Sequence, residues 1–96
     1  MNKYSLSVIT ITYNNLNFSK TLISVNMLRK YMKIEHIVIN GGDKLKDKNI
    51  HNVEKLVEEP DNGIYDALNK GLSIVSNEYV MFVHADDFIN DSYGVY

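Results

Sequence analysis

A short apolar run that ends in acidic residues most constrains the fold of this chain. Residues 79–83 read Tyr-Val-Met-Phe-Val and are followed by His84, Ala85, Asp86 and Asp87. An unbroken apolar run of this length is typical of a strand buried on both faces, as in a parallel sheet covered by helices. Ligands of such sheets bind beyond the carboxyl ends of the strands. The polar residues therefore stand where a binding site would form.

The polar end of this run has two interpretations. Side chains alternate along a strand, so His84 and Asp86 would share a face, and one divalent cation could contact both. Adjacent carboxylates are costly to bury unpaired, which favours a cation beside them or exposure to water. Alternatively, Asp86 and Asp87 only turn the chain or cap a helix, as aspartate commonly does.

The upstream sequence predicts strands and helices in alternation. Residues 4–12 are rich in β-branched side chains and predict a first strand, which ends in a polar turn. Residues 35–40 predict a second strand, closed by a turn at Gly41 and Gly42. Between them, apolar residues recur at spacings of three and four, as on the buried face of a helix. These residues are Phe18, Leu22, Val25, Leu28 and Met32.

The second half of the chain continues this alternation. Residues 44–52 are polar and lysine-rich, which predicts a solvent-exposed loop, and residues 53–58 predict a short strand that Pro60 ends. In the helix that follows, Asp66 and Lys70 are spaced to pair at i and i+4. The apolar side chains expected to face inward from this helix are Tyr65, Leu68, Leu72 and Val75.

This order of elements predicts an α/β domain with an open, mostly parallel sheet flanked by helices, a Rossmann-like arrangement. Right-handed crossovers bring the carboxyl ends of parallel strands to one edge. Polar clusters at residues 13–14, 40–41 and 84–86 would then meet there. Folding alone does not require such a meeting of polar groups, which indicates a binding site.

Composition excludes several classes of function. The 96 residues suffice for one small domain, and the absence of cysteine excludes disulfides, thiolate metal sites and cysteine nucleophiles. A net charge of −2 gives no basic surface for nucleic acid. Glycine patterns of dinucleotide and P-loop sites are missing. No apolar run approaches the roughly 20 residues of a transmembrane segment, and residues 1–12 lack the features of a signal peptide, so we expect a cytoplasmic location.

Three segments of the chain, in the same order, resemble the family 2 glycosyltransferases of the GT-A fold. Residues 7–14 read Ser-Val-Ile-Thr-Ile-Thr-Tyr-Asn, and residues 37–42 read Ile-Val-Ile-Asn-Gly-Gly. Residues 59–71 read Glu-Pro-Asp-Asn-Gly-Ile-Tyr-Asp-Ala-Leu-Asn-Lys-Gly, and the apolar strand with Ala-Asp-Asp at 85–87 follows. The nearest likeness is to bacterial enzymes of exopolysaccharide, capsule and O-antigen assembly. It implies inverting transfer from a nucleotide diphospho-sugar, usually a UDP-sugar, to a glycan or lipid-linked acceptor.

The resemblance also implies which residues bind the nucleotide. Asn40 stands where the family normally has an aspartate that recognises the base. Since an amide both donates and accepts hydrogen bonds, base binding would survive with altered selectivity. Asp66 matches an acidic position of the subgroup and would face the nucleotide, unless it only pairs with Lys70 on the helix surface. The base pocket would be lined by Thr12, Tyr13 and Asn14.

A metal site is implied at the end of the last strand. Asp86 matches the carboxylate that holds Mn²⁺ or Mg²⁺ against the diphosphate, and Ala85 lies beside it in the nucleotide site. There the cation offsets the charge that develops on the leaving phosphate. His84 occupies the first position of this motif, where the family has Asp or Asn. A neutral imidazole suits Mn²⁺ better than Mg²⁺, which prefers oxygen ligands.

In the family, the catalytic base and the acceptor site follow this metal motif. Here nine residues follow Asp87, so we expect residues 1–96 to be one domain, the nucleotide-sugar-binding part, with the acceptor-binding part absent and turnover incomplete. Uncovered apolar surface would favour a homo-oligomer. The alternative is a non-catalytic nucleotide-sugar-binding or interaction module. A third possibility is a remnant in which His84 and Asn40 have abolished nucleotide binding.

Overall fold

The structure is a computed structural model that describes residues 5–13, 18–45, 50, 52–60 and 63–84. In chain order its elements are β1 (Ser5–Thr12), α1 (Phe18–Met27), the 3₁₀ helix η1 (Leu28–Lys30), β2 (Lys33–Asn40), β3 (Lys55–Glu58), α2 (Ile64–Leu72) and β4 (Tyr79–His84).

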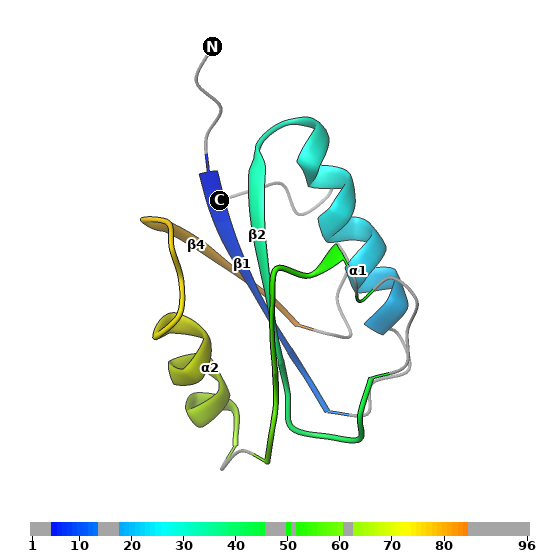
Figure 1. The fold of residues 1–96 in the computed structure, drawn as a ribbon, viewed down its shortest axis with the longest axis vertical. Coiled ribbons are helices and arrows are strands. Elements are labelled where there is room, and N and C mark those ends of the chain that lie inside the picture. Colours follow the sequence, from blue (N-terminus) through cyan, green and yellow to red (C-terminus); the bar gives the residue numbers. More distant parts are fainter. Residues whose placement is uncertain (1–4, 14–17, 46–49, 51, 61–62, 85–96) are drawn as a thin grey trace.

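The strands form one four-stranded sheet in the order β3-β2-β1-β4. Every neighbouring pair is parallel. The helices α1 and α2 lie on opposite sides of the sheet (Figure 1). The predicted α/β arrangement with a parallel sheet between helices is therefore confirmed.

The core has one apolar layer on each face of the sheet, and β1 contributes to both. On the α1 side, Leu6 and Val8 of β1 pack in a buried cluster with Val25. On the α2 side, Ile9 packs in a second cluster with Ala67. Alternation of side chains along a strand explains this division, because consecutive residues of β1 point to opposite faces. β1 is therefore buried on both faces, and so is β2, whose Ile37 and Val38 lie in opposite layers.

The prediction that residues 79–83 form a strand buried on both faces is wrong in one respect. These residues do form β4, but β4 lies at an edge of the sheet among the residues that the structure describes. Tyr79 is 65% exposed and Phe82 is 50% exposed, whereas Val83 is buried. The inner places belong to β1 and β2, each of which pairs with a strand on both sides.

The first helix agrees with its predicted buried face more closely than the second. Phe18, Leu22 and Val25 of α1 are buried, as is Leu28 of η1. In α2, however, the buried residues are Ala67 and Gly71. The predicted inward face is therefore wrong for Tyr65 and Leu72, which are 80% and 45% exposed, whereas Val75 packs against the buried cluster on the α2 side as predicted.

Close approach of α2 to the sheet explains why small residues face inward. A Cβ atom placed on Gly71 would lie 2.7 Å from Cγ2 and 3.0 Å from Cδ1 of Ile9, which is itself 1% exposed. Since neither atom has free space to move into, glycine allows the helix to lie this close to β1.

Two further differences concern the middle of the chain. The third strand begins at Lys55, two residues later than predicted, and β2 begins at Lys33, two residues earlier than predicted. The prediction of a solvent-exposed loop over residues 44–52 is wrong for Leu45 and Ile50. Both pack against the buried cluster on the α1 side that contains Phe18. These two apolar residues anchor the connection from β2 to β3.

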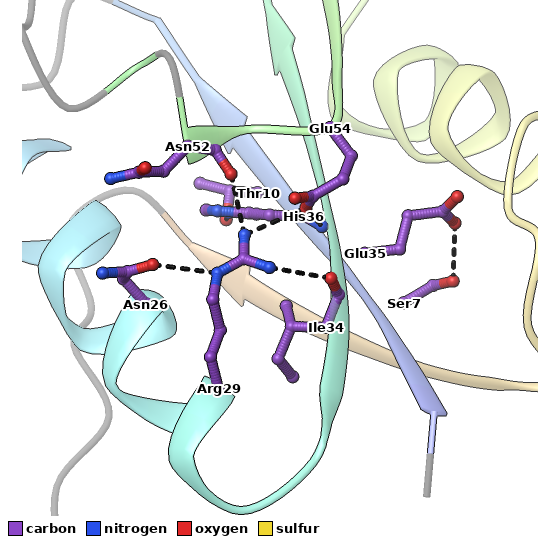
Figure 2. A network of polar contacts seen from close by, with 9 residues as sticks. All are labelled: Ser7, Thr10, Asn26, Arg29, Ile34, Glu35, His36, Asn52 and Glu54. Carbon is purple, nitrogen blue, oxygen red and sulfur yellow. Dashed lines mark hydrogen bonds and ion pairs between the residues drawn. The ribbon is translucent and has the colours of Figure 1, made fainter. Parts of the chain in front are cut away.

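Arg29 of η1 ties the end of the first helix to the neighbouring strands (Figure 2). Its Nη1 donates to the carbonyl oxygen of Ile34 at 2.9 Å, and its Nη2 donates to that of Asn52 at 2.7 Å. The guanidinium also contacts the side chains of Asn26 and Glu54. One side chain thus joins α1, the start of β2 and the segment before β3.

His36 lies buried beside this network. Its Nε2 is 2.7 Å from Oγ1 of Thr10, and its backbone N–H donates to Oε1 of Glu54 at 2.6 Å. Burial, with help from the charge of Arg29, lowers the pKa of His36 from 6.5 to about 4. The imidazole is therefore neutral in the folded chain at physiological pH.

Replacing Gly71 by alanine should lower the free energy of unfolding by about 1–3 kcal/mol, because the added methyl group overlaps Ile9. Urea unfolding followed by circular dichroism measures this change. Asn69→Ala, at an exposed position of the same helix, is the matched control and should change stability by less than about 0.5 kcal/mol. Equal stability of Gly71→Ala and the parent would contradict the close packing.

The stability of the chain should fall as pH is lowered from 6.5 towards 4. Over this interval the unfolded chain takes up a proton on His36 while the folded chain does not, so protonation stabilises the unfolded state relative to the folded state. The full shift corresponds to about 3 kcal/mol. Urea unfolding at a series of pH values gives the free energy of unfolding as a function of pH. This free energy should fall less steeply with decreasing pH in His36→Gln, which keeps a hydrogen-bonding side chain but does not titrate. An unchanged slope in that variant would contradict the assignment.

Candidate functional site

The carboxyl ends of three strands meet in register at one edge of the sheet. Thr12, the last residue of β1, pairs with Asn40, the last of β2, and Asn40 pairs with Glu58, the last of β3. Thr12 and Asn40 are 1% and 0% exposed. On the other side of β1, the backbone of His84 pairs with Ile11. The predicted meeting of strand ends is confirmed for the backbones of β1, β2 and β4.

The structure covers only some of the predicted site residues. Asn14, Ala85 and Asp86 lie outside the described residues, and for His84 only the backbone position is described. Tyr13 follows β1 directly and is 68% exposed. Gly41 donates its backbone N–H to the carbonyl oxygen of Thr12 at 3.1 Å, so the end of β1 lies beside the start of the turn after β2.

The Asn40 side chain holds the turn that follows β2. Its Nδ2 donates to the carbonyl oxygen of Asp43 at 2.8 Å and to Oε2 of Glu58 at 2.9 Å. Its Oδ1 accepts the backbone N–H of Gly42 at 3.0 Å. Both amide hydrogens of Asn40 are therefore used within the chain, and the side chain is fully buried.

Glu58 is the carboxylate of this edge that sequence analysis missed. Its Oε2 accepts a second hydrogen bond, from the backbone N–H of Leu45 at 2.8 Å. This bond and the one from Asn40, together with the charge of Lys44, lower the pKa of Glu58 below its ordinary value of 4.5. The available sequence signal was a charged residue at the end of a short predicted strand, immediately before Glu59 of the family-like segment.

A cavity of about 370 Å³ opens beside these residues. This volume lies within the range of small-molecule binding sites. The wall combines glycine backbone, a proline, a cation and two carboxylates. It is made by Gly41, Gly42, Lys44, Glu58, Glu59 and Pro60.

Lys70 joins α2 to the wall of this cavity. Its Nζ lies 3.1 Å from Oε1 of Glu59, 3.3 Å from Oδ2 of Asp66 and 3.0 Å from the carbonyl oxygen of Pro60. The predicted pairing of Asp66 with Lys70 is confirmed. Asp66 is half-buried on the side of α2 that faces the segment after β3.

The described residues contain neither a cluster of metal-ligating side chains nor a helix suited to cross a membrane. Within the ranges from residue 5 to residue 84 that the structure describes, no three His, Asp or Glu side chains are grouped to hold a metal ion. The predicted ligand Asp86 is outside those ranges. In the same part of the chain, neither helix has the length and apolar character needed to cross a bilayer.

Comparison with known proteins places these strands in a family. The family model described as Glycosyl transferase family 2 matches residues 7–93, which include every described strand and helix except the start of β1. The chain belongs to this family.

Similar curated proteins are named glycosyltransferases. An uncharacterized glycosyltransferase of Mycobacterium tuberculosis, Rv1514c, is 36% identical over 91 residues, which cover 86% of this chain and 34% of that protein. Glycosyltransferase GlyA of Streptococcus pneumoniae is 29% identical over 96 residues, or 92% of this chain and 14% of that protein. The family 2 chain thus spans about a third or less of the length of these relatives.

Replacing Asn40 by alanine should destabilise the fold and loosen the turn after β2. The change removes three hydrogen bonds and leaves their partners to find water, at a cost of about 2 kcal/mol in free energy of unfolding. Hydrogen exchange should show faster exchange at Gly42, whose N–H loses its acceptor. Asn69→Ala, an exposed asparagine of α2, is the control. Unchanged exchange at Gly42 would contradict the anchoring role of Asn40.

Proposed function

We propose that this chain is the nucleotide-sugar-binding part of a glycosyltransferase that uses a UDP-sugar donor and a glycan or lipid-linked acceptor. The observation that carries the proposal is the in-register meeting of Thr12, Asn40 and Glu58 beside a cavity of about 370 Å³. Ligands of parallel α/β sheets bind at this edge. Membership of glycosyl transferase family 2 supports a sugar donor as that ligand.

The cavity beside β2 and β3 is the proposed base subsite. Gly41 and Gly42 expose backbone there without side chains, so a flat ring can approach closely. The exposed ring of Tyr13, attached to the last residue of β1, supplies an aromatic surface on which a base can stack. Asn14 and Asp66 complete the proposed nucleotide contacts, with Asp66 held by Lys70.

The diphosphate is proposed to lie towards the end of β4. The backbone of His84, the last residue of β4, lies beside Ile11 of β1 at this edge, and Ala85 and Asp86 come next in the sequence. Carboxylate oxygens, with or without an imidazole, are suitable donors to Mn²⁺ or Mg²⁺. We assign Asp86 as the main ligand and His84 as a second one. When bound, the cation offsets the charge on the leaving diphosphate during displacement at the anomeric carbon.

Calorimetric titration of UDP into the purified chain tests this proposal. With Mn²⁺ we expect saturable binding, and removal of Mn²⁺ by a chelator should weaken it at least about tenfold, since the cation and the diphosphate attract each other strongly. Asp86→Asn should weaken binding to a similar degree while the circular dichroism spectrum stays unchanged. Glu78→Gln removes the same charge just before β4, at the opposite end of that strand, and should bind like the parent.

Three outcomes decide between the alternatives. Absence of UDP binding by the folded chain would sink the proposal. Binding that is equally strong without Mn²⁺ and in Asp86→Asn would remove the metal site but keep the nucleotide site. If UDP binds with Mn²⁺ and a mass-spectrometric assay detects no sugar transfer or donor hydrolysis, the chain by itself is a nucleotide-sugar-binding module.

A further inference from the structure

We propose that Glu58 selects the nucleotide base, by accepting a hydrogen bond from a ring N–H such as N3–H of uracil. This inference rests on the proposed function, because it assigns a specificity residue within the same base subsite. It differs from the expectation that Asn40 reads the base.

Asn40 has no donor left for a ligand. Both hydrogens of its Nδ2 are used, one by the carbonyl oxygen of Asp43 and one by Glu58, and the side chain is 0% exposed. A base could reach the Asn40 amide only by displacing one of these bonds and opening the turn that buries it. Asn40 is therefore a positioning residue that holds the turn and the carboxylate beside it.

Glu58 has what Asn40 lacks, a carboxylate oxygen that no described residue hydrogen-bonds, on a side chain that lines the cavity. Its Oε2 accepts from Asn40 and from the backbone of Leu45, whereas Oε1 accepts no hydrogen bond from the residues that the structure describes. The residue is exposed and contributes to the cavity wall. Two bonds on one oxygen fix the plane of the carboxylate, so the other oxygen is already oriented before a ligand binds.

The charge of Glu58 makes it selective for donors. The hydrogen bonds from Leu45 and Asn40 hold its pKa below 4.5, so at neutral pH the group is a carboxylate and accepts only. Uracil presents N3–H and guanine presents N1–H at the corresponding edge of the ring. Cytosine and adenine present a ring nitrogen with a lone pair at those positions, which a carboxylate repels. The two groups of bases are thereby distinguished by one atom.

Glutamine at position 58 tests this chemistry with little change in shape. In Glu58→Gln the amide oxygen can take the place of Oε2 and keep the bonds from Asn40 and Leu45. The amide NH₂ then takes the place of Oε1 and donates where the carboxylate accepted. The variant should therefore fold like the parent but prefer a ring nitrogen that accepts, as in cytosine.

The experiment is calorimetric titration of UDP, GDP and CDP, each with Mn²⁺, into the parent chain and into Glu58→Gln. We expect the parent to bind UDP at least about tenfold more tightly than CDP, because a hydrogen bond to a charged group is gained with one and lost with the other. In Glu58→Gln the ratio of the affinity for UDP to the affinity for CDP should fall by about tenfold or more. The GDP titration shows whether the preference extends to guanine, whose ring N1–H is also a donor, or is confined to uracil.

Controls separate selection from a structural effect. Glu78→Gln, which removes the same charge at the far end of the sheet, should keep the preference of the parent. A loss of affinity for UDP and CDP by the same factor in Glu58→Gln would show a merely structural role and overturn the inference. So would a parent chain that binds CDP as tightly as UDP.

The two proposals fail in different ways. If the parent binds no nucleotide at all, both the proposed function and the role of Glu58 are wrong. If the parent binds UDP in a manner that depends on Mn²⁺, and the UDP-to-CDP ratio is unchanged in Glu58→Gln, the proposed function stands and only the specificity assignment is overturned.

Discussion

Parallel pairing of β1 with strands on both of its sides is the constraint on which this structure depends. An eight-residue strand with neighbours on each side and a helix over each face buries side chains in both directions, and Val8 and Ile9 show this by packing on opposite faces. Because all strands run the same way, their carboxyl ends meet at one edge. Polar residues placed after the strands therefore gather there, and the position of the candidate site is a consequence of topology.

The sequence predicted the order and type of the elements well, because β-branched runs and helical spacing are local signals. It failed where burial depends on distance between elements. For α2, a periodic analysis places large residues such as Tyr65 and Leu72 inward, yet the close approach at Ile9 admits only Ala67 and Gly71. For β4, an apolar run cannot distinguish a central strand from one at an edge, since that depends on which strands pair.

The site residues also divide into those that local sequence signals predict and those that depend on tertiary contacts. Thr12 and Asn40 could be predicted because they end strongly marked strands, and the pairing of Asp66 with Lys70 follows from helical spacing alone. Glu58 could not be predicted, because only the register between β2 and β3 brings its carboxylate beside Asn40. Tertiary contacts accompany that register, among them the hydrogen bond that the backbone N–H of His36 donates to Oε1 of Glu54, and such contacts have no local signature.

The two edge strands of the described sheet differ in how readily a further strand could pair with them. On β3, Lys55 and Glu58 place charges along a strand of only four residues, and both side chains already have partners within the chain. Short, charged edges discourage a new strand from pairing. On β4, the exposed rings of Tyr79 and Phe82 flank a longer apolar strand. Additional strands, from whatever chain they come, would therefore extend the sheet past β4, leaving the β3 side and its neighbouring cavity open to small molecules.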